Sequence, residues 1–108
     1  MKRGDLITVA VQGDYGKPRP ALVIQSDNFS QHPSITILPV TSKIVDAPLI
    51  RVTVEPAANN GLTQQSQIMI DKALTIPREK AGKHLGSIDY VTAQEIDRCL
   101  AVFLGIAK

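Results

Sequence analysis

The chain is poor in aromatic side chains and in cysteine, and it lacks tryptophan altogether. Because Cys99 is the only cysteine, no disulfide can form within the chain, which favours a reducing compartment. With aromatic residues at 4% and hydrophobic residues at 44%, the core must be built mainly from aliphatic side chains. No apolar run reaches transmembrane length, and no long apolar segment follows the charged N-terminus. We therefore expect a cytoplasmic protein without a signal peptide or a membrane contact.

A large excess of one charge is also lacking, since 12 basic and 10 acidic residues give a formal net charge of +2. This mildly basic balance is compatible with a nucleic acid or an acidic peptide as partner, although no lysine- or arginine-rich run is present. The length of 108 residues is that of one ordinary domain. Residues 1–108 are therefore predicted to form a single domain.

The residues for a metal or cofactor site are missing as well. His32 and His84 are far apart, and neither has a cysteine, histidine or carboxylate at ligand spacing. Both are predicted to lie on the surface. No glycine-rich phosphate loop precedes a helix, and Cys99 has no base beside it, so we predict that Cys99 is a core residue. The sequence therefore predicts no metal and no cofactor.

Short β-rich runs separated by turn residues make up most of the chain. Strands are predicted over residues 6–11, 19–25, 34–40, 49–55, 66–71 and 72–76, the last two as separate strands or as one bent strand. The second run is nearly all apolar and is expected to be buried on both faces. Pro39 predicts a sheet edge or a bulge in the third strand, because proline cannot donate to a ladder. Residues 77–82 are predicted to be a loop or a short helix that begins at Pro77.

One helix is predicted at the C-terminal end. Thr92 and Glu95 have the spacing of a capping box, with Thr92 as the N-cap. The apolar stripe expected to face the core consists of Ile96, Leu100, Phe103 and Ala107, with Cys99 and Ile106 beside it. Many short strands followed by a helix predict a mainly β fold, a small antiparallel barrel or a strongly curved sheet with a C-terminal α-helix. A parallel sheet would need crossover helices, which the sequence does not show.

Three polar positions at strand ends are candidates for chemistry. Arg19 lies in a Lys-Pro-Arg-Pro turn before an apolar strand, either as a solvated strand end or as a rigidly held phosphate ligand. Thr41 and Ser42 close the third strand, where they either form a turn or bond a phosphate. Asp71 is either solvated or, if the strands converge, able to orient Arg19 by a charge-assisted hydrogen bond.

These motifs, taken in order, resemble one known family. The segments are residues 2–6 (KRGDL), 17–24 (KPRPALVI), 38–42 (LPVTS) and 71–77 (DKALTIP). Together they resemble the MazF/PemK toxins of the CcdB/MazF superfamily, which belong to type II toxin–antitoxin systems. The similarity extends over nearly the whole chain.

The resemblance implies a fold, an activity and partners. The fold is a compact SH3-like barrel with a C-terminal helix (CcdB/MazF-like), usually a homodimer. The activity is metal-independent, sequence-selective cleavage of single-stranded RNA, through attack of the 2′-hydroxyl on the neighbouring phosphate. A cognate antitoxin, usually with an acidic tail, inhibits such toxins. The family pattern carries over to Arg19 and Thr41 as catalytic residues, with Ser42 and Asp71 in support.

The first loop supplies candidates for RNA binding, and the fifth predicted strand departs from the family pattern. Tyr15 offers a stacking platform and Lys17 a phosphate contact, and Asp14 lies beside them as a further candidate for RNA binding. Met69 stands where some members of the family carry a second catalytic arginine. No obvious general base remains in the sequence, so three outcomes stay open: slow cleavage, cleavage that depends on Asp14, Tyr15 or Asp71, or no cleavage.

Two other functions remain open from the sequence. A CcdB-like toxin of the same superfamily would bind DNA gyrase without cleaving anything, through its surface and terminal helix. An SH3-like binding module would have kept only the barrel. The match at Arg19 and Thr41 favours the ribonuclease over both.

Overall fold

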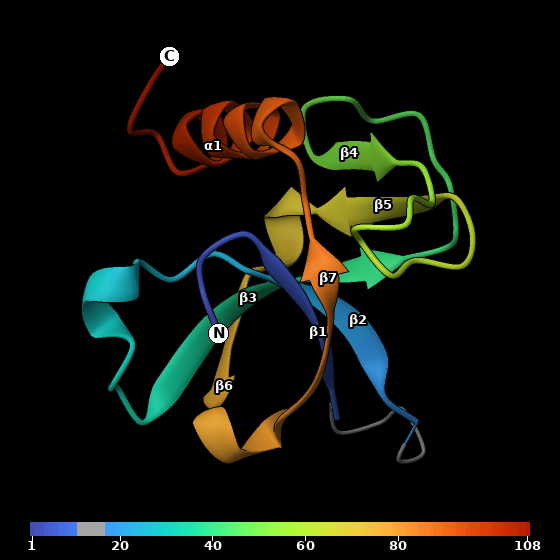
Figure 1. Ribbon diagram of the computed structural model, residues 1–108. Coiled ribbons are helices and arrows are strands. Elements are labelled where there is room, and N and C mark those ends of the chain that lie inside the picture. Colours follow the sequence, from blue (N-terminus) through green and yellow to red (C-terminus); the bar gives the residue numbers. More distant parts are fainter. Residues whose placement is uncertain (11–16) are drawn as a thin grey trace.

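The computed structural model of the protein describes residues 1–10 and 17–108, in which antiparallel strands precede a C-terminal helix (Figure 1). The strands of this part are β1 (Asp5–Val9), β2 (Arg19–Val23), β3 (Ser34–Thr41), β4 (Arg51–Val54), β5 (Ser66–Met69), β6 (Leu74–Pro77) and β7 (Ala81–Ser87). Its helical elements are the 3-10 turns η1 (Asp27–Phe29), η2 (Ile70–Lys72) and η3 (Arg78–Lys80) and the α-helix α1 (Tyr90–Phe103). The predicted class, mainly β with a C-terminal helix, is confirmed.

The eight-residue strand β3 organises the sheet. It pairs with β2 along one side, while on the other side its first half pairs with β6 and its end pairs with β5. The full order is β4-β5-β3-β2-β1-β7, with β6 added beside β3. The predicted edge or bulge at Pro39 is wrong, because β3 is an interior strand. Pro39 lies between the β6 and β5 pairings, where a residue without an N–H interrupts neither ladder.

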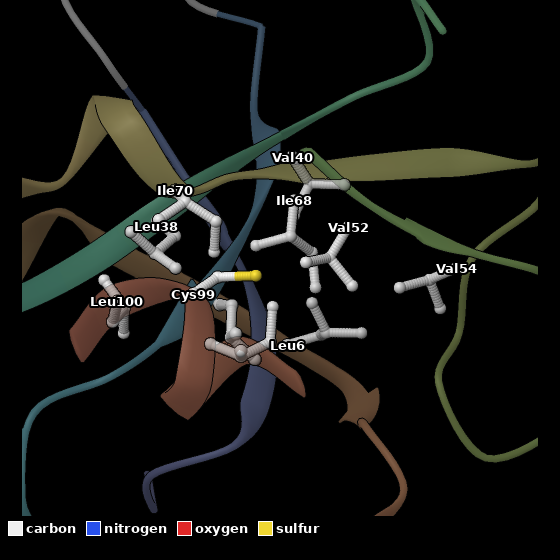
Figure 2. Packing of buried hydrophobic residues seen from close by; sticks show 11 residues of the cluster. Leu6, Leu38, Val40, Val52, Val54, Ile68, Ile70, Cys99 and Leu100 are labelled. Carbon is white, nitrogen blue, oxygen red and sulfur yellow. The ribbon is translucent and has the colours of Figure 1, made fainter. Parts of the chain in front are cut away.

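The strands β1, β2 and β3 are buried on both faces because their residues alternate between two apolar clusters. Leu6, Leu22 and Leu38 face the larger cluster, which also contains side chains from β4, β5 and α1. Their sequence neighbours, such as Ala21 and Ile37, face the smaller cluster. Figure 2 shows Cys99 among the aliphatic side chains of the larger cluster. The prediction that the second strand is buried on both faces, and that Cys99 belongs to the core, is confirmed.

The helix α1 begins earlier than its sequence pattern predicts. Asp89 is the N-cap, and its carboxylate oxygen accepts a 2.7 Å hydrogen bond from the backbone N–H of Thr92. The capping box at Thr92 and Glu95 is therefore wrong, and Glu95 pairs instead with Arg98. Asp89 is favoured over Thr92 as the N-cap because a carboxylate also interacts favourably with the positive end of the helix.

The apolar stripe of α1 is shorter than predicted. Ile96, Cys99 and Leu100 are buried, and α1 packs against β4 and η2 (Figure 1). Phe103 ends the helix half-exposed, and Ile106 is 78% exposed beyond it, so the predicted core role of Phe103, Ile106 and Ala107 is wrong. The chain turns away because Gly105 has φ +77° just after the helix. No helix in the described ranges is long and apolar enough to cross a membrane.

The strand β7 is absent from the sequence-based prediction. Its sequence, AGKHLGS, has no β-branched residue and two glycines, both unfavourable for a strand. Tertiary contacts impose the conformation, because β7 pairs with β1 and its glycines lie against neighbouring segments. The predicted pair of strands at 66–76 is two separate strands, which η2 divides. Pro77 ends β6, and the short helix predicted there is η3, which begins one residue later.

Candidate active site

One pocket, with a volume of about 440 Å³, opens where the ends of β2 and β3 meet the loop between β4 and β5. Arg19, Thr41 and Ser42 line its polar part. The loop contributes residues 61–64, and apolar side chains of β1, β6 and β7 complete the lining. The pocket therefore combines a guanidinium, several hydroxyls and the Gln64 amide with apolar surface.

Arg19 is held at this pocket by the strand that follows it. It is the exposed first residue of β2, and Ala21, Leu22 and Val23 behind it are buried. The antiparallel register pairs Ala21 with Pro39, and continued by two residues it brings Arg19 opposite Thr41. Since the flanking prolines fix φ on both sides, the guanidinium projects from a stiff backbone. The predicted meeting of Arg19 and Thr41 at one place is therefore seen in the structure.

Thr41 ends β3 and Ser42 follows it, and both residues line the pocket. The Thr41 hydroxyl oxygen accepts a 3.1 Å hydrogen bond from the backbone N–H of Lys43. Its O–H proton makes no hydrogen bond to any described residue, so it is able to donate to a ligand. Ser42 is exposed and lines the same pocket.

Gln67 fixes the segment that follows these hydroxyls. It pairs with Thr41 across β3 and β5, and its side chain is buried. The amide nitrogen donates to the Val45 carbonyl at 2.9 Å and to the Thr53 hydroxyl at 3.1 Å, while the amide oxygen accepts from the Val45 N–H at 3.1 Å. The sequence gives no signal for this role, because a glutamine in a short strand is usually solvated.

The loop between β4 and β5 is seated on β7. The buried Asn60 accepts hydrogen bonds from the N–H groups of Ala57 and Leu62 and donates to the Glu55 carbonyl. A Cβ on Gly86 would lie 2.4 Å from the Asn59 carbonyl oxygen, so only glycine lets the loop approach β7 this closely. Asn59-Asn60-Gly61 predicts a turn, but its contact with β7 is long-range and not visible in the local sequence.

Asp71 lies outside the pocket lining and bonds to Arg51. Its carboxylate is also 3.8 Å from the ammonium of Lys72. Burial raises the pKa of Asp71, but the hydrogen bond and charge of Arg51 lower it by more, so the pKa lies below its usual value. The predicted role of orienting Arg19 therefore gives way to an ion pair with Arg51, because η2 turns this carboxylate toward β4.

Two further positions from the sequence analysis, Met69 and Lys17, can be placed relative to the pocket. Met69 lines the pocket, so the departure from the family pattern is in the site itself. Lys17 is exposed before β2 and does not line the pocket. Asp14 and Tyr15 lie outside the described residues.

Other groups with potential chemistry lie apart from the pocket. His32 and His84 are exposed, as predicted, and His84 is 3.5 Å from the Asp5 carboxylate. Burial raises the pKa of the Cys99 thiol, and its contact with Glu95 adds to this effect. A raised pKa keeps the thiol protonated and weakly nucleophilic. No cluster of His, Cys, Asp and Glu that could hold a metal ion occurs in residues 1–10 and 17–108.

Two known proteins are similar to this chain in sequence over nearly its whole length. The probable endoribonuclease MazF of Mycolicibacterium smegmatis is 45% identical over 99% of both chains. Endoribonuclease EndoA of Bacillus subtilis is 26% identical over 98% of this chain and 96% of its own.

Solved structures match the fold at lower identity. An endoribonuclease in complex with its cognate antitoxin from a mycobacterial species has a TM-score of 0.82 at 20% identity, with 100% of this chain and 98% of that chain covered. The MazE–MazF complex of Deinococcus radiodurans has a TM-score of 0.78 at 24% identity, with coverage of 99% and 97%. These structures bear on the fold alone.

The family model for the PemK-like, MazF-like toxins of type II toxin–antitoxin systems matches residues 2–104. That range includes Arg19, Thr41 and every strand and helix described above. With the match extending over nearly the whole chain, this protein belongs to the PemK-like, MazF-like family of type II toxins.

Proposed function

We propose that this chain is a toxin of a type II toxin–antitoxin system that cleaves single-stranded RNA at selected sequences, and that residues 1–108 act as a single domain. The observation that supports it best is the meeting of Arg19, Thr41 and Ser42 in one pocket of a MazF-type fold. A planar guanidinium beside hydroxyls is suited to a phosphate, because several directed hydrogen bonds then reach its oxygens.

The proposed reaction uses the substrate's own nucleophile. The 2′-oxygen forms a bond to phosphorus while the bond from phosphorus to the 5′-oxygen breaks, leaving a 2′,3′-cyclic phosphate and a 5′-hydroxyl. The proton lost from the 2′-hydroxyl balances the one that the 5′-oxygen gains. Arg19 stabilises the charge on the phosphoryl oxygens, and Thr41 and Ser42 hydrogen-bond them and fix the geometry. We propose that no metal takes part, since Arg19 supplies the positive charge.

The attack also needs a base that takes the proton of the 2′-hydroxyl. A carboxylate that is paired with Arg51 and has a lowered pKa is a weak base, so Asp71 is disfavoured for this role. Asp14 and Tyr15 remain the candidates for the general base. Lys17, two residues before Arg19, is proposed to contact a neighbouring phosphate of the RNA.

We further propose that a cognate antitoxin covers this pocket with an acidic tail and that two copies of the toxin form a homodimer. Charge complementarity at Arg19 and Lys17 supports the first idea. The exposed side chains of Phe103, Leu104 and Ile106 at the end of α1 support an apolar interface. We place the action in the cytoplasm, where messenger RNA is available.

The experiment is cleavage of a long single-stranded RNA in EDTA by the wild type, Arg19→Ala and Arg98→Ala. Arg98 is the matched control, because it is an exposed arginine on α1 whose partner is Glu95. We expect Arg19→Ala to cut about 100-fold more slowly or worse, and Arg98→Ala to cut like the wild type. Fragments should carry cyclic phosphate and 5′-hydroxyl ends.

A second substrate tests the nucleophile. Replacing the single 2′-hydroxyl at a mapped cut with hydrogen should abolish cleavage there and leave the other sites unchanged. Cutting at the deoxy position would contradict the proposed attack. A folded wild type that cuts nothing would refute the ribonuclease and direct attention to DNA gyrase.

A further inference from the structure

The pocket is larger than a phosphate needs. Its volume of about 440 Å³ is in the range of sites that enclose a whole small ligand, roughly 300–1,000 Å³. Besides Arg19 and Thr41, its lining includes the apolar side chains of Leu62, Leu74 and Leu85. A nucleotide joins a phosphate to a flat base with apolar faces and a polar edge. The lining therefore has apolar surface for a base beside the groups for its phosphate.

Gln64 is the pocket residue that offers an amide. It is exposed, and its side chain makes no hydrogen bond to any described residue. Its neighbours differ, because the Gln65 amide nitrogen donates to the Glu55 carboxylate at 2.7 Å and the Gln67 amide is buried among three hydrogen bonds. Only the amide of Gln64, of these three, is both at the pocket and available to a ligand.

The backbone that carries Gln64 is held in place before any ligand arrives. Asn60 closes the preceding turn with hydrogen bonds to three backbone groups. Gly61 has a φ of +71°, and it lies so close to β7 that a Cβ would clash with the carbonyl oxygen of Leu85. The Ser66 hydroxyl donates to the Gln64 carbonyl at 2.9 Å, which fixes the residue from its C-terminal side. A group mounted on an ordered backbone loses less entropy on binding and discriminates better.

We infer that Gln64 reads the edge of an adenine in one of the two nucleotides that flank the phosphate bound by Arg19 and Thr41. This inference rests on the proposed ribonuclease function. An amide presents a donor and an acceptor side by side, which matches the N6 and N7 groups of adenine. Unstacked bases of single-stranded RNA expose this edge to a protein.

The test is the sequence preference of cleavage, measured by sequencing the cut sites in a pool of RNAs with randomised positions. The proteins are the wild type, Gln64→Ala, Gln64→Glu and the matched control Gln65→Ala. We expect the wild type to favour adenine beside the cut and Gln64→Ala to lose about 10-fold to 100-fold of that preference while it still cuts. Gln64→Glu, which keeps only acceptors, should shift the preference toward cytosine, whose N4 group donates.

The outcomes separate this inference from the proposed function. Cleavage by Gln64→Ala with an unchanged adenine preference overturns the inference alone, as does a wild type that shows no adenine preference at the cut. Equal loss of preference in Gln65→Ala also overturns it, because that would be an effect of the loop. No cleavage by the folded wild type overturns both. Thermal unfolding of each variant checks that the exposed substitutions leave the fold intact.

Discussion

At the scale of single residues, the pocket depends on side chains whose roles differ in how visible they are in the sequence. Arg19 is recognisable because prolines flank it and an apolar strand follows it. Thr41 is recognisable because it closes a β-branched run. Gln64 and Asn60 lie in polar turn sequence, where many residues of the same type are merely solvated. Asn60 matters because it closes a turn that lies against β7, and Gln64 because it lines the pocket, and local patterns encode neither.

Asp71 and Arg51 supply a pH-dependent contribution to stability. Since the pKa of Asp71 is below its usual value of about 3.8 in the folded protein, the carboxylate stabilises the fold above that pH. The stabilisation is lost as the pH falls through the folded-state pKa. We expect Asp71→Asn to unfold at lower urea than the wild type at pH 7.

The same comparison at acid pH tests the sign. The gap between the two urea midpoints should stay constant from pH 7 to about 4 and close only below that value. A gap that closes near neutral pH would contradict the assignment to this carboxylate. Cleavage at pH 7 should persist in Asp71→Asn, because the residue lies outside the pocket.

At the scale of elements, the strands rich in β-branched residues were predictable, and the element that depends on tertiary contact was not. β1 to β5 correspond to apolar or alternating runs, although β4 starts at Arg51 rather than at residue 49. β7 was missed because its glycines, which disfavour a strand locally, are required by the segments packed on it. Sequence patterns thus located most strands but missed one that shapes the pocket.

The start of α1 provides a direct test of which residue caps it. Asp89→Ala should lower the midpoint of urea unfolding, because the N–H of Thr92 then loses its acceptor. Thr92→Ala is the comparison and should lower it less, since it removes only the Thr92 side-chain hydrogen bond to Asp89 and leaves the backbone N–H capped. Equal effects of the two substitutions would support the capping box instead.

At the scale of the whole molecule, the two apolar clusters and the antiparallel architecture follow from the binary pattern and agree with the MazF-type fold. The pocket could be predicted only in part. Its phosphate-binding part lies at two strand ends that the sequence marks, at Arg19 and Thr41. Its other part is a loop from the middle of the chain resting on a strand near the end, and no short-range pattern predicts that contact.

The close contact between this loop and β7 can be tested by adding one methyl group at Gly86. Gly86→Ala would place a Cβ against the Asn59 carbonyl, so we expect it to cost about 1–3 kcal/mol in the free energy of unfolding and to slow RNA cleavage. Gly105→Ala is the control. A Cβ there meets nothing within 4 Å, and its φ of +77° costs about 1–2 kcal/mol.

The two glycine variants would thus lose similar stability, measured by urea unfolding, but only Gly86→Ala should lose cleavage at temperatures where both are folded. Equal activity of both would mean that the loop does not need its seat on β7.

The pairing of Asp5 with Ser87 also determines when the pocket can form during synthesis of the chain. During translation, β1, β2 and β3 are synthesised first. However, β1 can pair with its second neighbour, β7, only after Gly86 has been made. The loop that contains Asn60 also gains its contact with β7 only at that stage. Contacts between distant segments form late. A growing chain that already carries Arg19 and Thr41 therefore has no complete pocket until β7 has been made.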